Sequence, residues 1–259
     1  MKKFLGLIFS SVNIGEFKVI TIFGLKFKIE NYAPALHRIE AALGRFNSRY
    51  DLPNLSIEHS MFLLAGIQTA EYVMKNMDKV KTFDDKLELL SYAFSISQKD
   101  GLNLEFGVFS GETINHLSSK YPTLKFYGFD SFEGLPEAWR SNFEKGMFAC
   151  EGLPKVNQNV ELIKGWFDSS LPDFVAKEKE YCSFIHIDCD IYSSTKTVFD
   201  LLADRIKSGT VIVFDEYFNY PNWQKHEFKA FQEFVAANGI KYEYIGYVTT
   251  LEQAAVRII

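Results

Sequence analysis

The chain has 259 residues, of which 47% are hydrophobic and 24% charged, and its formal net charge is −5. This balance is typical of a globular protein with a substantial core, and it argues against a nucleic-acid partner, which usually selects a basic face. The three cysteines, Cys150, Cys182 and Cys189, include no Cys-x-x-Cys pair. Their odd number favours a reducing cytoplasm over a disulfide framework.

The first residues resemble the start of a signal peptide. Their apolar run is very short, however, and no small-residue cleavage site follows, so a buried N-terminal segment is the favoured interpretation. No apolar run in the chain approaches the roughly 20 residues of a membrane span. Residues 2–28 contain five lysines and one glutamate, which leaves loose attachment to an anionic membrane surface as an alternative.

The N-terminal third is predicted to be mainly helical after a short β segment. Partial alternation over residues 17–29 predicts a hairpin or two short strands. From Pro34 the period becomes helical, and two further helices are predicted at about 56–76 and 83–98. Because this region has no catalytic signature, we interpret residues 1–98 as a cap or oligomerisation region, which is compatible with a homodimer.

From Gly101 onward, short apolar runs alternate with helical segments such as 196–207 and 226–238. This alternation predicts βαβ units and a mostly parallel sheet with helices on both faces, an α/β fold over residues 99–259. The predicted strands are Leu104–Phe109, Lys125–Phe129, Val160–Lys164, Phe184–Ile187, Val211–Phe214, Tyr242–Gly246 and Ala254–Ile258.

Ligands of open α/β sheets bind at the carboxyl ends of the strands. The first strand runs into Glu105-Phe-Gly107-Val-Phe-Ser-Gly111-Glu-Thr113, where glycines let the backbone approach a ligand and a helix start offers free N–H groups. A tight strand–helix turn explains these glycines equally well. Asp130 ends the next strand and can accept both ribose hydroxyls, although it also suits a turn. Together the two signals predict a nucleoside site without a dinucleotide pyrophosphate.

Two later strands end in acids. Asp188 and Asp190 are two residues apart and share one side of an extended strand, and Asp215 and Glu216 follow another apolar strand. Carboxylates gathered in one cleft repel each other unless a cation compensates them, and oxygen ligands suit magnesium. The alternative is an acidic cleft that is merely solvated.

These residues together resemble the class I methyltransferases, and more narrowly the macrocin O-methyltransferase-like family. The resemblance spans about 102–250 and leaves the N-terminal third outside it. The stretches that carry it are Glu105-Phe-Gly107-Val-Phe-Ser-Gly111, Gly128-Phe-Asp130-Ser-Phe-Glu-Gly-Leu-Pro136, Gly165-Trp-Phe-Asp168, His186-Ile-Asp188-Cys-Asp190-Ile-Tyr-Ser-Ser-Thr195 and Val213-Phe-Asp215-Glu216-Tyr217.

The resemblance implies a Rossmann-like sheet of seven strands, the last antiparallel, with S-adenosylmethionine as cofactor. Glu105 and Gly107 would lie near the methionine end, Asp130 would hold the ribose, and the loop 165–168 would border the adenine. The resemblance also implies a magnesium ion on Asp188, Asp215 and Glu216. The full set of candidate cofactor residues is Glu105, Gly107, Gly111, Thr113, Asp130, Ser131, Trp166, Phe167 and Asp168.

Family substrates include hydroxyls of sugars on natural products or polysaccharides, so the resemblance implies O-methylation of such an acceptor. Residues 131–159 lack the histidine that the related antibiotic enzymes are expected to carry after the second strand. His226 is therefore the candidate base, with Asp188 as the second candidate catalytic residue. His186 and His116 are interpreted as packing residues. Four aromatic residues are candidates for stacking on a sugar, although packing explains each equally well: Trp139, Trp166, Trp223 and Tyr217.

Two other functions compete with methyl transfer. Asp188-Cys-Asp190 resembles the Asp-x-Asp of nucleotide-sugar glycosyltransferases, and a non-catalytic binding protein on a methyltransferase fold would have the same strand ends. The glycines around Gly107 followed by Asp130 favour an adenosine ligand over a diphosphate. Sugar, phenol and small amide acceptors all remain open.

Overall fold

The computed structural model describes residues 9–14, 17–22, 25–30 and 56–259. The chain divides into two compact units, Met1–Ile57 and Glu58–Ile259. Among the described residues, none of the helices combines the length and the apolar character that a membrane crossing requires.

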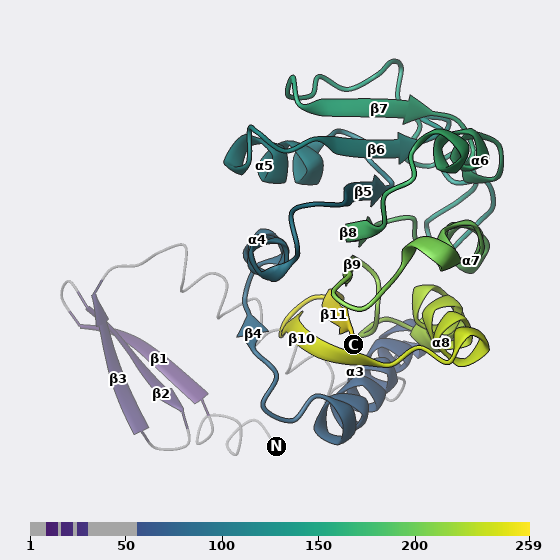
Figure 1. The fold of residues 1–259 in the computed structure, drawn as a ribbon. Coiled ribbons are helices and arrows are strands. Elements are labelled where there is room, and N and C mark those ends of the chain that lie inside the picture. The colour runs from purple at the N-terminus through teal and green to yellow at the C-terminus, as the bar shows by residue number, and fades with distance from the viewer. Residues whose placement is uncertain (1–8, 15–16, 23–24, 31–55) are drawn as a thin grey trace. The chain divides into compact units, whose positions relative to one another are not determined.

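The first unit contains a three-stranded antiparallel sheet of β1 (Phe9–Ile14), β2 (Phe17–Ile22) and β3 (Leu25–Glu30) (Figure 1). The hairpin predicted over residues 17–29 corresponds to β2 and β3, which pair from Phe17–Glu30 to Ile22–Leu25. β1 was not predicted. The helix predicted from Pro34 lies outside the described residues, and a role of residues 1–98 as a cap or oligomerisation region stays a prediction.

The second unit is built on an eight-stranded sheet in the order β4-β10-β11-β9-β8-β5-β6-β7. β11 is antiparallel to both of its neighbours, and the pairs from β9 to β7 are parallel. The predicted α/β fold is confirmed, and two-residue β4 extends the expected seven strands at one edge. The strands are β4 (Thr82–Phe83), β5 (Leu102–Phe106), β6 (Phe126–Asp130), β7 (Val160–Lys164), β8 (Cys182–Ile187), β9 (Val211–Phe214), β10 (Tyr242–Val248) and β11 (Ala254–Ile258).

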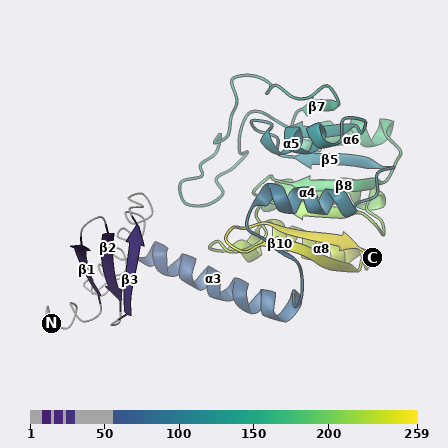
Figure 2. The same ribbon diagram turned by 90° about the vertical axis from the view of Figure 1, so that its left-hand side faces the viewer.

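Helices cover both faces of this sheet (Figures 1 and 2). α4 and α5 lie on one face, and α6, α7 and α8 lie on the other (Figure 1). Asp85 caps α4 by accepting from the backbone N–H groups of Leu87 and Glu88. The bounds are α3 (Ile57–Asn76), α4 (Lys86–Ile96), α5 (Glu112–Lys120), α6 (Phe167–Lys177), α7 (Tyr192–Leu202) and α8 (Glu227–Asn238).

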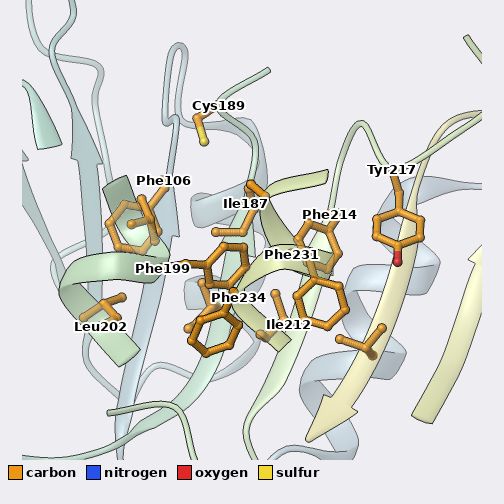
Figure 3. Packing of buried hydrophobic residues seen from close by; sticks show 14 of the residues in the cluster. Phe106, Ile187, Cys189, Phe199, Leu202, Ile212, Phe214, Tyr217, Phe231 and Phe234 are labelled. Carbon is orange, nitrogen blue, oxygen red and sulfur yellow. The ribbon is translucent and has the colours of Figure 1, made fainter. Parts of the chain in front are cut away.

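Aromatic side chains fill the layer between the sheet and α6–α8. Phe199 of α7 stacks on Phe234 of α8 with ring centroids 4.7 Å apart, and Phe214 of β9 contacts Phe231 (Figure 3). All four are buried, so this layer excludes water and holds the strand ends rigidly. The chain order reverses around β5, which lies between β8 and β6. A crevice is expected at such a point, at the carboxyl ends of the strands.

Candidate active site

A cavity of about 450 Å³ opens at the carboxyl ends of the parallel strands. Residues that follow five neighbouring strands, β5 to β9, contribute to its wall. Segments 134–148 and 193–197 and Lys86 complete it. Nine of the predicted site residues line it: Gly107, Asp130, Ser131, Trp166, Phe167, Asp168, Asp188, Asp215 and Glu216.

Gly107 allows β5 and β8 to come together at the cavity floor. Its φ is +91°, and a Cβ there would lie 1.6 Å from the carbonyl oxygen of Asp188. Any side chain would therefore collide with the backbone of the neighbouring strand end. The close approach leaves the backbone around Gly107 bare toward the cavity.

Asp130 organises the loop after β5. Its Oδ2 accepts hydrogen bonds from the N–H groups of Val108 and Phe109, both 2.8 Å away, and its Oδ1 accepts from Phe132 N–H at 2.7 Å. The carboxylate is half-buried and faces the cavity. Each carboxylate oxygen has two lone pairs, so Oδ1 can still accept a ligand hydroxyl.

Three predicted cofactor residues, Glu105, Gly111 and Thr113, are not among the residues that line the cavity. Glu105 is buried below its floor, where it accepts from Thr113 Oγ1 at 2.9 Å and pairs with His186 Nδ1 at 3.0 Å. Gly111 is the N-cap of α5 with φ +82°. Strand alternation separates Glu105 from the cavity, because a side chain inside β5 points toward one face of the sheet.

Four acids gather around the ends of β8 and β9: Asp188, Asp190, Asp215 and Glu216. Desolvation and the neighbouring Asp215 and Asp190 raise the pKa of Asp188 well above its ordinary value. Burial and the same like charges raise the pKa of Glu216. Burial, followed by Asp215, raises the pKa of Asp190 to about 7. The cluster is therefore short of positive charge.

Two overlapping groups in this cluster have metal-ligand spacing among the described residues. One joins His186, Asp188 and Asp215, and the other joins Asp188, Asp190 and Glu216, with the ligand atoms of each group within 4.8 Å of one another. Asp188 belongs to both. Neither group contains all three predicted ligands, because Asp215 and Glu216 belong to different groups that share Asp188.

Residues 104–217, which include all five strand ends of the cavity, match the sequence model of a family described as a methyltransferase domain. The chain is a methyltransferase. S-adenosylmethionine is its methyl donor, and the prediction of a class I enzyme is confirmed. The glycosyltransferase and non-catalytic alternatives are set aside. The narrower macrocin-like resemblance stays a prediction, and no curated protein matches the chain.

Two solved structures have the fold of this methyltransferase. The crystal structure of CalS11, a calicheamicin methyltransferase, superposes with a TM-score of 0.56 at 18% identity, over 80% of this chain and 95% of CalS11. The O-methyltransferase NovP superposes with a TM-score of 0.51 at 17% identity, over 66% of this chain and 78% of NovP. At these identities the likeness establishes the shared fold.

Sequence reasoning missed two residues of the methyltransferase site. Lys86, at the start of α4, lines the cavity with its Nζ 3.7 Å from Asp215 Oδ2. Burial alone would lower the pKa of Lys86, but Asp215, Asp188 and Glu216 outweigh it and raise the pKa. Asp85 and Lys86 form a helix start in the sequence, and a lysine one residue after a cap carries no signal for a site.

Glu227, the second missed residue, is fully buried at the start of α8. Its Oε1 accepts from the N–H groups of Cys189 and Asp190 at 3.3 and 3.2 Å, and its Oε2 accepts from Glu216 N–H at 3.2 Å. One carboxylate therefore connects the loops after β8 and β9. A glutamate next to the predicted His226 is the only sequence signal that pointed here.

His226 itself is not among the residues that line the cavity. Its ring packs near Trp139 and Tyr220, and burial followed by Arg140 lowers its pKa. Its role as the base stays a prediction. Of the four aromatic candidates, Tyr217 and Trp223 are buried in the core, whereas Trp139 and Trp166 line the cavity.

Proposed function

We propose that this methyltransferase is a magnesium-dependent O-methyltransferase that acts on a hydroxyl of a sugar, glycoconjugate or related natural product. One observation carries the proposal: a single cavity is lined by Gly107 and Asp130 and also by the acid cluster around Asp188. The first suits an adenosine-containing donor, and the second suits a cation that binds an acceptor oxygen.

The donor fits the chain's own groups. Asp130 Oδ1 has a free lone pair for a ribose hydroxyl, and Trp166, 37% exposed, offers an aromatic surface beside it for the adenine. Ser131 borders Asp130, and Phe167 and Asp168 extend the rim at the start of α6. Glu105 and Thr113 support this wall from below through their hydrogen bond.

A divalent cation also fits. Glu216 Oε2 is buried and has no hydrogen-bond partner among the described residues, although an unpaired buried carboxylate oxygen is costly. Among the described residues, Lys86 is the lysine or arginine that forms an ion pair with an acid of the cluster, and it approaches Asp215 rather than Glu216. We propose that Asp188, Asp215 and Glu216 hold the ion, which would lower the pKa of a coordinated hydroxyl.

The chain's own residues then orient the acceptor and take its proton. The transferred methyl group is already activated on the donor, so alignment of the acceptor oxygen is the main requirement. Asp190 lines the cavity, and one of its carboxylate oxygens lies within 4.8 Å of a carboxylate oxygen of Asp188. We infer that Asp190 accepts the proton in place of the predicted His226, which does not line the cavity, and that Asp188 positions the hydroxyl beside it.

The acceptor is inferred to be a sugar because of an aromatic residue and three hydroxyl side chains that also line the cavity. Trp139 contributes an indole ring, over which the Arg140 guanidinium lies, and Ser193, Ser194 and Thr197 offer hydroxyls at the first turns of α7. Stacking with flanking hydroxyls is chemistry that suits a sugar. Three unpaired cysteines support the further proposal that the enzyme works in a reducing cytoplasm.

The test combines binding with turnover. Calorimetry should detect S-adenosylhomocysteine binding, and methyl transfer to candidate sugars, phenols and amides should be measured with magnesium and with chelator. Asp215→Ala should lower magnesium-supported transfer at least about a hundredfold, because a ligand is lost. The matched control is Asp200→Ala, which removes an exposed acid paired with Lys196 on α7 and should retain activity. Full activity of the chelated enzyme would overturn the magnesium part of the proposal.

A further inference from the structure

A buried chain of polar side chains runs from the start of α5 to the acid cluster. Thr113 Oγ1 donates to Glu105 Oε1 at 2.9 Å, and Glu105 Oε2 lies 3.0 Å from His186 Nδ1. At the far side of the ring, His186 Nε2 lies 4.0 Å from Asp215 Oδ1. Thr113, Glu105 and His186 are each at most 6% exposed, so water does not separate them.

Glu105 decides which nitrogen of His186 carries the proton. A carboxylate can only accept a hydrogen bond, so Nδ1 is an N–H, and in the neutral ring Nε2 then has a free lone pair. That lone pair faces the carboxylate of Asp215 at a distance too long for a hydrogen bond. Two such electron-rich atoms repel each other unless a proton or a metal ion lies between them, and binding of a metal by Nε2 distinguishes the two.

The distance between these atoms is within the reach of a shared metal ion. A cation with bonds of about 2.1 Å to a nitrogen and to an oxygen can span 4.0 Å between them. Asp188 supplies a third atom, because one ligand atom each of His186, Asp188 and Asp215 lies within 4.8 Å of the others. The unpartnered Oε2 of Glu216, whose side chain is 8% exposed, independently marks a missing positive charge in the same cluster.

We propose that His186 is a nitrogen ligand of the cation, beside Asp188 and Asp215, and that Glu105 is the positioning residue that fixes its tautomer. This inference rests on the cation of the proposed function. Under this inference, Glu105 supports the metal site and does not contact the methyl donor. His186 then binds the cation and is more than a packing residue. A nitrogen ligand also shifts the preference of the site from magnesium toward manganese and later first-row metals.

The test uses the full chain loaded with Mn²⁺, without any substrate. Electron spin echo envelope modulation of bound Mn²⁺ should show coupling to a directly bonded ¹⁴N. Growth with ¹⁵N-labelled histidine should replace that coupling by the ¹⁵N pattern, which assigns the nitrogen to histidine without any substitution. This measurement therefore does not depend on the folding of a variant.

Variants then assign the histidine. His186→Asn retains a polar atom near Nδ1 for Glu105 but has none at Nε2, so the coupling should disappear and Mn²⁺ affinity should fall at least about tenfold. His116→Asn and His226→Asn are matched controls that should leave the coupling intact, since His116 hydrogen-bonds to Ser91 Oγ and His226 packs near Trp139. Glu105→Gln should weaken Mn²⁺ binding about 10–100-fold while the ¹⁴N coupling persists.

The outcomes separate this inference from the proposed function. Bound Mn²⁺ without histidine coupling, or with coupling that survives His186→Asn, would overturn the role of His186 and leave an all-oxygen magnesium site standing. Failure of the wild-type chain to bind either Mn²⁺ or Mg²⁺ would overturn the cation itself, and both proposals with it.

Discussion

At the residue scale, Asp190 combines a left-handed backbone with a raised pKa. Its φ is +66°, a conformation that asparagine also tolerates, and it is 8% exposed. Asp215, Glu252 and Asp130 raise its pKa further, and Arg140 opposes them. Asp190→Asn therefore removes the charge without disturbing the backbone.

The charge of Asp190 should make stability depend on pH when no divalent ion is bound. Its pKa rises on folding from 3.8 to about 7, so the folded state binds the proton more tightly than the unfolded state. The resulting stabilisation is fully present below the unfolded value and is lost as the pH rises through about 7. Urea denaturation in chelator should show stability falling over this window, by at most about 4 kcal/mol from this residue.

Asp190→Asn should flatten that profile. The matched control Asp168→Asn changes an exposed acid of the same cavity and should keep the wild-type slope. If the unfolding free energy falls equally steeply with pH in the wild type and in Asp190→Asn, the Asp190 carboxyl does not cause the pH dependence.

Glu227 holds the loops of the acid cluster in place through its hydrogen bonds. Its two oxygens accept three backbone N–H groups, and an amide would turn a donor toward at least one of them. Glu227→Gln should therefore cost about 1–3 kcal/mol of unfolding free energy and weaken cation binding. Glu233→Gln, on the exposed side of the same helix, is the control and should change neither. Chemical denaturation measures the unfolding free energy of both variants, and metal titration measures their affinity for the cation. Equal changes in the two variants would contradict the role of Glu227.

At the scale of elements, the approach of β5 to β8 depends on one missing side chain. Gly107→Ala should cost at least about 3 kcal/mol, because the new Cβ meets Asp188 backbone oxygen and the φ is left-handed. Gly146→Ala is the control: its φ is +84°, and a Cβ there meets nothing within 4 Å, so only about 1–2 kcal/mol of backbone strain is expected. If chemical denaturation shows similar losses of unfolding free energy for the two variants, the close contact between β5 and β8 does not contribute to stability.

Strand positions were predictable to within a few residues because they depend on local apolar runs. Val160–Lys164, Val211–Phe214 and Ala254–Ile258 were predicted with the bounds observed for β7, β9 and β11. The helix predicted at 196–207 begins instead at Tyr192 and ends at Leu202. Its first turn is polar and faces the cavity, so the apolar period that signals a helix starts late.

At the scale of the whole molecule, residues 58–259 contain the full eight-stranded sheet and every residue that lines the cavity. We expect a fragment of these residues to fold cooperatively and to bind S-adenosylhomocysteine within about threefold of the full chain, because each unit has its own internal contacts. Thermal unfolding and calorimetry of both proteins test this. A fragment that is unfolded, or that binds more than about tenfold more weakly, would show that residues 1–57 complete the site.

The sequence by itself determined the alternation of strands and helices, and with it the acids and glycines that follow the strands, because apolar periodicity and turn chemistry are local properties. Only the tertiary structure decided that Lys86 and Glu227 join the acid cluster and that Glu105 lies below the cavity beside His186. Most of these relations join residues far apart in the chain: Glu227 and Cys189 are 38 residues apart, and Lys86 and Asp215 are 129 residues apart. These contacts depend on how the elements pack against one another, and no local sequence pattern predicts that packing.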